Sequence, residues 1–102
     1  MGRYLDMINS PADVKLLKEV LQPYVDQGIE YHALRTRQSG ARRFVSLHVL
    51  VPPEWSVQRG HELLERVEGD IRRALQPVTV FTHLEPLGDP AAMADLDLHR
   101  DD

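Results

Sequence analysis

The chain has 102 residues, of which 42% are hydrophobic and 27% charged, and its 16 acidic and 12 basic side chains give a formal net charge of −4. These values predict a single globular domain and argue against nucleic acid as the main partner. The sequence contains no apolar run long enough for a membrane span or a signal peptide. The lack of cysteine excludes disulfides and thiolate ligands, so a bound metal must be held by nitrogen and oxygen atoms, and the composition is compatible with the cytoplasm.

The first predicted helix follows a segment without a clear pattern. Residues 1–9 show no apolar period and are interpreted as a linker or leader. Ser10 and Pro11 then form a typical helix start, with a capping side chain followed by proline in the first turn. Apolar residues recur at helical spacing as far as Gly28, which predicts a helix over about 11–26. These residues are Val14, Leu17, Val20, Leu21 and Val25.

A β-hairpin and a second helix come next. The stretch YHALRTRQSGARRFVSLHVLV, residues 31–51, has two alternating arms around a Gln-Ser-Gly turn, which predicts strands over about 29–37 and 42–51. Two prolines end the second strand, because proline cannot continue a sheet ladder. Ser56 is a suitable cap for the helix that follows. The apolar stripe of this helix consists of Val57, Gly60, Leu64, Val67, Ile71 and Leu75.

A third strand completes the predicted domain. VTVFTHLEP, residues 78–86, alternates as a half-buried strand does. Residues 88–102 are acidic and are interpreted as a flexible tail with solvated charges. The order α, β, β, α, β predicts an α+β domain over residues 10–87, in which two helices cover one face of a three-stranded sheet and leave the other face open.

Strand alternation places candidate metal ligands on the open face. In the second strand an apolar set is expected to face the helices, namely Val45, Leu47, Val49 and Val51. His48 therefore lies on the opposite side, and the same reasoning places His83 and Glu85 there from the third strand. His32 joins them if the first strand also presents Glu30 and Leu34 on that side, which depends on a register that the sequence does not determine.

These side chains form a ligand set typical of a transition metal. Three imidazoles and a carboxylate suit Zn²⁺, with Co²⁺, Ni²⁺, Cu²⁺, Mn²⁺ and Fe²⁺ as competitors. The competing interpretation is that each histidine is a tolerated surface residue, because His-x-Glu pairs also occur in strands by chance. The presence of histidines on three different strands, with Glu85 two residues after His83, favours the metal site.

The chain resembles a known family in three stretches, namely residues 31–51, the helical stretch SVQRGHELLERVEGDI at 56–71, and residues 78–86. Together they are similar to the cytoplasmic C-terminal domain of cation diffusion facilitator transporters, the zinc and iron exporters of bacteria and eukaryotes. The resemblance implies a ferredoxin-like, metallochaperone-like αββαβ fold that forms a homodimer and binds divalent cations at the dimer interface. It also implies a membrane transporter domain as partner, so the chain is interpreted as a piece of a transporter or as a freestanding relative.

The resemblance assigns ligand roles by position. It implies that the metal is bound by His32, His48, His61, His83 and Glu85. From the sequence alone, His61 is instead interpreted as a partly buried, hydrogen-bonded histidine. The family often has an acidic residue where this chain has Ala33, so the surroundings of His32 depart from the family pattern.

The predicted function is a metal-responsive homodimer in the cytoplasm that takes part in cation efflux and is not an enzyme. Its ion is Zn²⁺, with Cd²⁺, Co²⁺, Ni²⁺, Mn²⁺ and Fe²⁺ as further candidates. A cation that bridges two protomers would favour their closed arrangement. Two alternatives stay open. One is a small zinc-dependent hydrolase with Glu85 as a free base, and the other is a purely structural dimerisation module.

Overall fold

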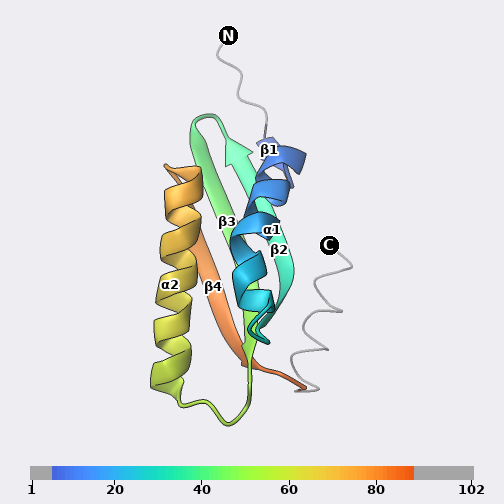
Figure 1. The fold of residues 1–102 in the computed structure, drawn as a ribbon. Coiled ribbons are helices and arrows are strands. Elements are labelled where there is room, and N and C mark those ends of the chain that lie inside the picture. Colours follow the sequence, from blue (N-terminus) through green and yellow to red (C-terminus); the bar gives the residue numbers. More distant parts are fainter. Residues whose placement is uncertain (1–5, 89–102) are drawn as a thin grey trace.

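The computed structural model describes residues 6–88 (Figure 1). In chain order its elements are β1 (Asp6–Ile8), α1 (Pro11–Val25), β2 (Glu30–Ser39), β3 (Arg42–Val51), α2 (Val57–Leu75) and β4 (Thr79–Pro86). The predicted tail, apart from Gly88, lies outside the described residues. In the described part of the chain, no helix is both long and apolar enough to cross a membrane.

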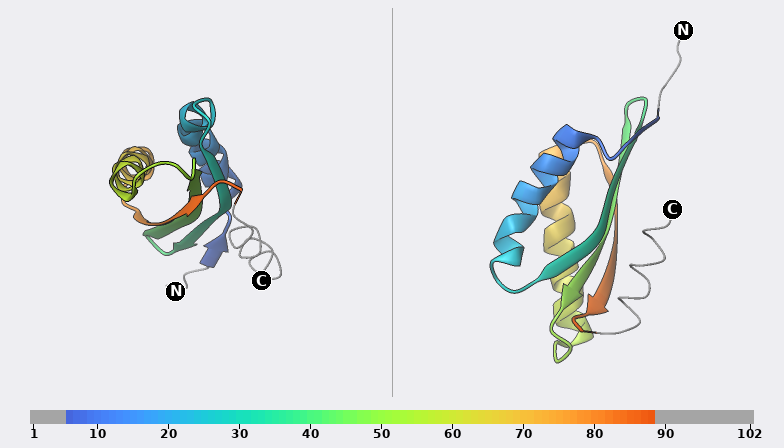
Figure 2. Two further views of the ribbon diagram at one scale, coloured as in Figure 1. Left: turned by 90° about the horizontal axis from the view of Figure 1, so that it is seen from below. Right: turned by 90° about the vertical axis from the view of Figure 1, so that its right-hand side faces the viewer.

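The strands form one mixed sheet in the order β1-β2-β3-β4. β2 and β3 pair antiparallel as a hairpin, and β4 pairs parallel to β3 after the connection through α2. Both helices lie on the same side of the sheet (Figure 2). The predicted α+β fold, with two helices on one face of three long strands, is therefore confirmed.

A fourth, short strand extends this sheet at the β2 edge. β1 falls within residues 1–9, the segment interpreted as a linker or leader, and pairs Met7 with Gln38 of β2. Asn9 holds the turn that follows, because its backbone N–H donates to the Thr36 carbonyl oxygen at 2.7 Å and its side-chain oxygen accepts from the Thr36 N–H at 3.1 Å. The linker interpretation is thus wrong for residues 6–8, which belong to the sheet.

The two helices begin in different ways. At α2, the Ser56 side chain accepts a hydrogen bond from the Arg59 N–H at 3.0 Å, as the predicted cap requires. At α1, Ser10 makes no such side-chain bond, and only its carbonyl oxygen accepts, from Val14 N–H at 2.9 Å. Pro11 starts that helix, because its fixed φ angle suits the first turn and its missing N–H has no helical partner to lose.

The core lies between the helices and the sheet. β3 contributes the apolar set that alternation predicts, Val45, Leu47, Val49 and Val51, and all four are buried. On α2 the buried stripe is Gly60, Leu63, Val67, Ile71 and Leu75. Two residues of the predicted stripe are not buried in the structure. Val57 is exposed in the first turn, and Leu64 is only partly buried, whereas its neighbour Leu63 is buried in the core. Gly60 allows α2 to pack closely on β4, since an added Cβ would lie 2.3 Å from Leu84 Cδ2.

A polar contact joins the two helices at the rim of this core. The Tyr24 hydroxyl of α1 donates a hydrogen bond to the Asp70 carboxylate of α2, and Arg73 pairs with the same carboxylate. Burial and the bond to Asp70 raise the pKa of Tyr24 to about 12.

Candidate metal centre

Three of the predicted ligands lie in one row across the sheet. The register pairs His32 of β2 with His48 of β3, and His48 with His83 of β4. Residues paired directly across neighbouring strands point to the same face. Since Val49 and Leu47, the neighbours of His48, are packed among the helices, the three imidazoles stand on the face that the helices leave open.

A bulge in β2 produces this register. Between the pairs His32–His48 and Arg35–Ser46, β2 has two residues where β3 has only Leu47. Ala33 adopts φ 55°, a left-handed conformation that non-glycine residues rarely adopt. The bulge turns Leu34 to the helix side, where it packs against the core, and brings Arg35 to the open face. The expectation that Leu34 shares a face with His32 is therefore wrong.

His48 is the central member of the row and contacts two other candidates. Its Nε2 lies 3.3 Å from His83 Nδ1, and the two rings meet edge to face with centroids 4.9 Å apart. Its Nδ1 contacts the Glu85 carboxylate. A carboxylate accepts a hydrogen bond from a ring nitrogen that carries a proton. This contact therefore places the proton of His48 on Nδ1 and leaves the lone pair of Nε2 directed at His83. His48 is 7% exposed, which keeps bulk water from most of the ring.

His32 stands at the other end of the row with its own carboxylate. Its Nε2 lies 4.0 Å from Glu30 Oε1, within β2. Among residues 6–88, no group of three or more histidine, aspartate and glutamate side chains has already converged around one point as a metal site would. The face thus carries two small donor sets side by side, His48 with His83 and Glu85, and His32 with Glu30.

His61 is not part of this row within the chain. It lies on α2, on the helix side of the sheet, and its side chain is 68% exposed with Nε2 3.9 Å from Glu65 Oε1. The interpretation of His61 as a partly buried histidine is wrong, because its side chain lies on the exposed side of α2, away from the buried Gly60 and Leu63. A role as a ligand beside the other histidines would require a second chain.

The distance between two of the nitrogen donors fits a divalent metal ion. Two nitrogen ligands that are each about 2.05 Å from a tetrahedral Zn²⁺ are about 3.3 Å apart. The separation of His48 Nε2 and His83 Nδ1 is 3.3 Å. The pair is therefore spaced as two ligands of one ion are, a separation that a hydrogen bond between the two rings also gives.

The sequence did not predict which other side chains of β2 lie on the open face. The bulge places Arg35 and Arg37 on the open face, opposite Ser46 and Phe44. The register and the positive φ at Ala33 reveal this shift in the structure, but no residue type at positions 32–35 signals a bulge in the sequence.

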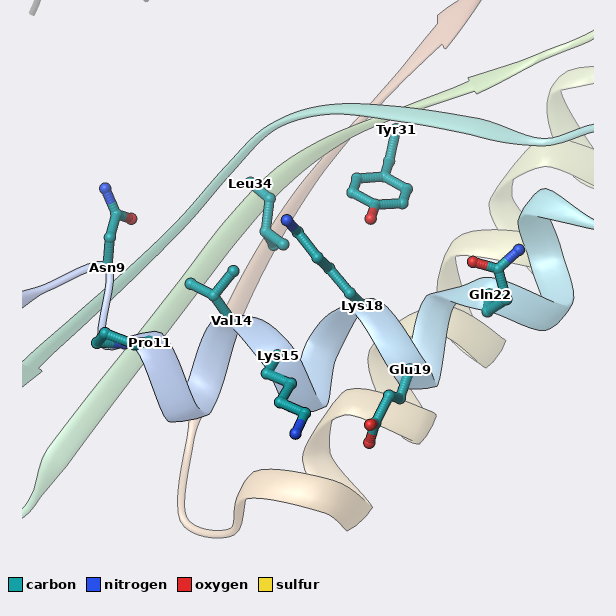
Figure 3. A pocket seen from close by; sticks show the side chains of 9 residues that line it. All are labelled: Asn9, Pro11, Val14, Lys15, Lys18, Glu19, Gln22, Tyr31 and Leu34. Carbon is teal, nitrogen blue, oxygen red and sulfur yellow. The ribbon is translucent and has the colours of Figure 1, made fainter.

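A separate groove lies away from the histidines, between α1 and β2 (Figure 3). It encloses about 790 Å³ and is lined by Val14, Tyr31 and Leu34, with Lys18 of α1 extending toward Leu34. No histidine lines this groove, and the only acidic side chain there is Glu19. The groove is therefore not part of the candidate metal centre.

Residues 10–87 match the family model described as the cytoplasmic domain of cation efflux proteins. The chain belongs to this family. The resemblance to cation diffusion facilitator domains is thereby confirmed.

Two relatives illustrate the extent of the likeness. An uncharacterized transporter of Synechocystis sp., sll1263, is 46% identical over 86 residues, which cover 84% of this chain and 28% of that protein. The cation-efflux pump FieF of Pectobacterium atrosepticum is 30% identical over 56 residues, 55% of this chain and 19% of the pump. The chain thus spans less than a third of the length of each of these relatives.

Solved structures share the fold. The putative zinc transporter CzrB, solved also in a zinc form, is 29% identical with a TM-score of 0.70, over 78% of this chain and 98% of that one. The metal-bound C-terminal domain of the CzcD transporter from Thermotoga maritima has a TM-score of 0.71 at 23% identity, over 78% of this chain and 93% of that domain.

Proposed function

We propose that this chain is a divalent-metal-binding dimerisation domain that regulates a cation efflux transporter from the cytoplasmic side. The observation that supports this most strongly is the row of His32, His48 and His83 across three strands, with the Glu85 carboxylate against His48. Imidazole and carboxylate ligands of this kind suit Zn²⁺ first, and Cd²⁺, Co²⁺, Ni²⁺, Mn²⁺ or Fe²⁺ as alternatives. The zinc form of CzrB supports zinc as the ion.

The proposed partner at this face is a second copy of the chain. The open face carries apolar side chains between its polar ones, and Phe81 remains 55% exposed in the single chain. Pairing two chains near this face would remove Phe81 from water and would bring two sets of donors together. In such a dimer, His61 of one chain is the proposed further ligand of an ion held mainly by the other chain.

Metal would act by favouring one arrangement of the two copies. Donors from both protomers converge only when the protomers close, so a cation binds the closed arrangement more tightly and shifts the population toward it. Since the core is formed by apolar residues on the other face, the fold of each protomer does not depend on the ion. In an intact transporter, closure would be transmitted to the membrane domain that we propose as the covalent partner.

The test is zinc binding by the His48→Ala/His83→Ala double variant in isothermal titration calorimetry. We expect tight binding to be lost, while Glu62→Gln, which removes a carboxylate on the outer side of α2, leaves the affinity unchanged. Zinc affinity should also fall steeply as the pH is lowered through the range in which imidazoles take up protons, because several ligands must be neutral at once. An unchanged affinity in the double variant would refute this assignment of the site.

The two alternatives give different results in the same experiments. A hydrolase needs Glu85 as a free base, but that carboxylate already contacts His48 Nδ1, and activity on ester or phosphate substrates would be required to support this role. A purely structural module would form a dimer of equal affinity with and without zinc, as measured by analytical ultracentrifugation.

A further inference from the structure

The edge of β2 that faces away from β3 is only partly paired. β1 pairs with β2 over residues 37–39. Asn9 then uses both backbone groups of Thr36, since it donates to the carbonyl oxygen and accepts from the N–H. After Asn9 the chain turns away into α1, and among residues 6–88 no strand lies along this edge at residues 30–34. Backbone groups at such an edge can pair with an added strand.

The groove between α1 and β2 lies beside this unpaired edge. Asn9 and Pro11 lie at one end of the groove, where β1 leaves the edge, and Gln22 lies at the other end (Figure 3). From Pro11 to Gln22, α1 advances by about 17 Å at roughly 1.5 Å per residue. An extended segment of about five residues covers the same distance at roughly 3.3 Å per residue. The groove therefore has the length of a short strand.

The floor of the groove is apolar and is not fully covered. Tyr31 and Leu34 of β2 face the groove, and Val14 of α1 lies opposite them. All three side chains are only partly buried. An apolar side chain placed between them would be removed from water, together with the parts of these residues that are still exposed. The floor thus favours a ligand with aliphatic groups.

Lys18 brings one positive charge to these apolar surroundings. Its side chain extends from α1 toward Leu34, whereas Lys15 and Glu19 point away from β2 (Figure 3). Within the described part of the chain, Lys18 has no ion pair or hydrogen bond. A carboxylate forms strong charge-assisted hydrogen bonds with an ammonium group. The groove therefore suits a ligand that carries an acidic group beside its apolar groups.

The bulge at Ala33 limits how much of the edge an added strand can use. The extra residue interrupts the ladder, so regular pairing is available at residues 30–32 and not across the bulge. Three residues supply few backbone hydrogen bonds. The side chains in the groove must therefore contribute much of the affinity, and they decide which sequences bind.

We propose that the groove between α1 and β2 binds an extended segment of a partner protein, which adds as a strand to the edge of β2 at residues 30–32. The segment places an apolar side chain between Val14 and Leu34 and a carboxylate on Lys18. Side chains two residues apart in a strand point to the same side, so the recognised pattern is an acidic residue with an apolar residue two positions away. This site uses none of the histidines of the proposed metal centre.

The test uses a synthetic peptide with the sequence Thr-Val-Thr-Glu-Thr-Val-Thr, blocked at both ends. Its pattern is the same in both directions, so it suits a parallel and an antiparallel added strand. It is titrated into the full chain in the presence of EDTA and followed by NMR. The amide signals of Val14, Lys18, Tyr31 and Leu34 should shift. The matched control peptide, Thr-Val-Glu-Thr-Thr-Val-Thr, has the same composition but turns its carboxylate to the other side, and it should bind more weakly.

Two further comparisons separate the charge from the strand pairing. Lys18→Glu should weaken binding by about fivefold to tenfold, because an attraction becomes a repulsion. Arg66→Glu, which makes the same change of charge on α2 outside the groove, should leave the affinity unchanged. Backbone N-methylation of the peptide at alternate residues removes the N–H groups along one of its two edges. One of the two alternating sets should abolish binding and the other should not, because only one edge faces β2.

Four outcomes would overturn the proposal. The first is that the groove signals do not move at millimolar peptide. The second is that the shifts appear at Phe44 and Phe81 instead, which would place the peptide on the open face. The third is equal affinity for wild-type protein and Lys18→Glu. The fourth is that both N-methylated peptides bind as well as the unmodified one, which would exclude strand addition. Because EDTA is present throughout, each result is independent of metal binding at the histidine row.

Discussion

The two faces of this sheet differ in what their side chains do, although they alternate residue by residue along the same strands. On the helix side, β3 presents four buried aliphatic residues that belong to one core cluster with residues of both helices. On the open side, the same strand presents Phe44, Ser46, His48 and Leu50. The first face buries the apolar area that stabilises the fold. The second face carries the polar and aromatic side chains that are suited to bind a ligand.

This separation means that stability and binding should respond to different substitutions only one position apart. Leu47 and His48 are neighbours in sequence, but their side chains point to opposite faces. Because alternate residues of a strand point to opposite faces, a substitution on one face can change ligand binding without altering the packing of the core on the other face. Four predictions test how complete this separation is.

The largest expected effect is from Leu47→Ala. Leu47 is fully buried between the helices and the sheet, and its truncation should lower the free energy of unfolding by about 2–5 kcal/mol, since it leaves a cavity. Urea denaturation of metal-free protein measures this. The zinc affinity of the molecules that remain folded should be unchanged, and a large loss of affinity would show that the two faces are coupled.

The next effect is the response of stability to zinc. At a hundredfold excess over the dissociation constant, zinc should add about 2.7 kcal/mol to the stability of the wild-type protein and raise its Tm. The far-ultraviolet circular dichroism should hardly change, because the helices belong to the other face. His48→Ala/His83→Ala should show no rise in Tm in a thermal melt, and an equal rise in that variant would place the ion elsewhere.

A smaller effect concerns the contact between the two helices at Tyr24. Its pKa is raised from 10.0 to about 12, so between these pH values the folded state keeps a proton that the unfolded chain loses. Stability should therefore fall as the pH rises from about 10 to 12. Tyr24→Phe should abolish this part of the pH dependence and cost about 1 kcal/mol at neutral pH through the lost bond to Asp70. Absorbance titration of tyrosinate, compared between the two proteins, measures the shift directly.

The smallest effects are expected at two glycines of α2. Gly69→Ala should stabilise by about 0.5–1 kcal/mol, because its Cβ would meet only the guanidinium group of Arg73, with Nη1 at 3.5 Å, and alanine favours helix. Gly60→Ala should destabilise by about 1 kcal/mol, since its Cβ would displace Leu84 on the helix-covered face. Chemical denaturation of both variants gives the comparison, and a stabilising Gly60→Ala would mean that this face is packed less tightly than the distances indicate.

Sequence patterns predicted the helix-covered face well because packing on one side imposes a strict period. The alternation of Val45, Leu47 and Val49 could be assigned without a structure, since a slip by one residue would expose the whole set. The start of α2 at Ser56 was equally predictable, because a capping side chain has a local partner three residues away.

Features that depend on long-range pairing were not predictable in the same way. β1 has only three residues, too few to show a period, and its place in the sheet depends on β2 residues about thirty positions later. The bulge at Ala33 has no signature in residue type, so the sequence left the side of His32 open and put Leu34 on the wrong face. On α2, Leu63 and Leu64 are both leucine, and only the orientation of the helix on the sheet decides which one is buried.

The bulge also lets two halves of β2 with opposite sequence alternation share one open face. Because β2 has one residue more than β3 between the pairs at His32 and Arg35, the apolar alternation before and after it is out of step by one position. If β2 kept all its residues in a regular ladder, one of the two segments would have to exchange its faces. Either Tyr31 would leave the core and His32 would take its place, or Thr36 would exchange with Arg35. Deleting Ala33, by contrast, would leave Leu34 alone opposite Leu47 and keep both His32 and Arg35 on the open face, so the left-handed residue carries the change of phase without itself presenting a side chain that the ladder needs.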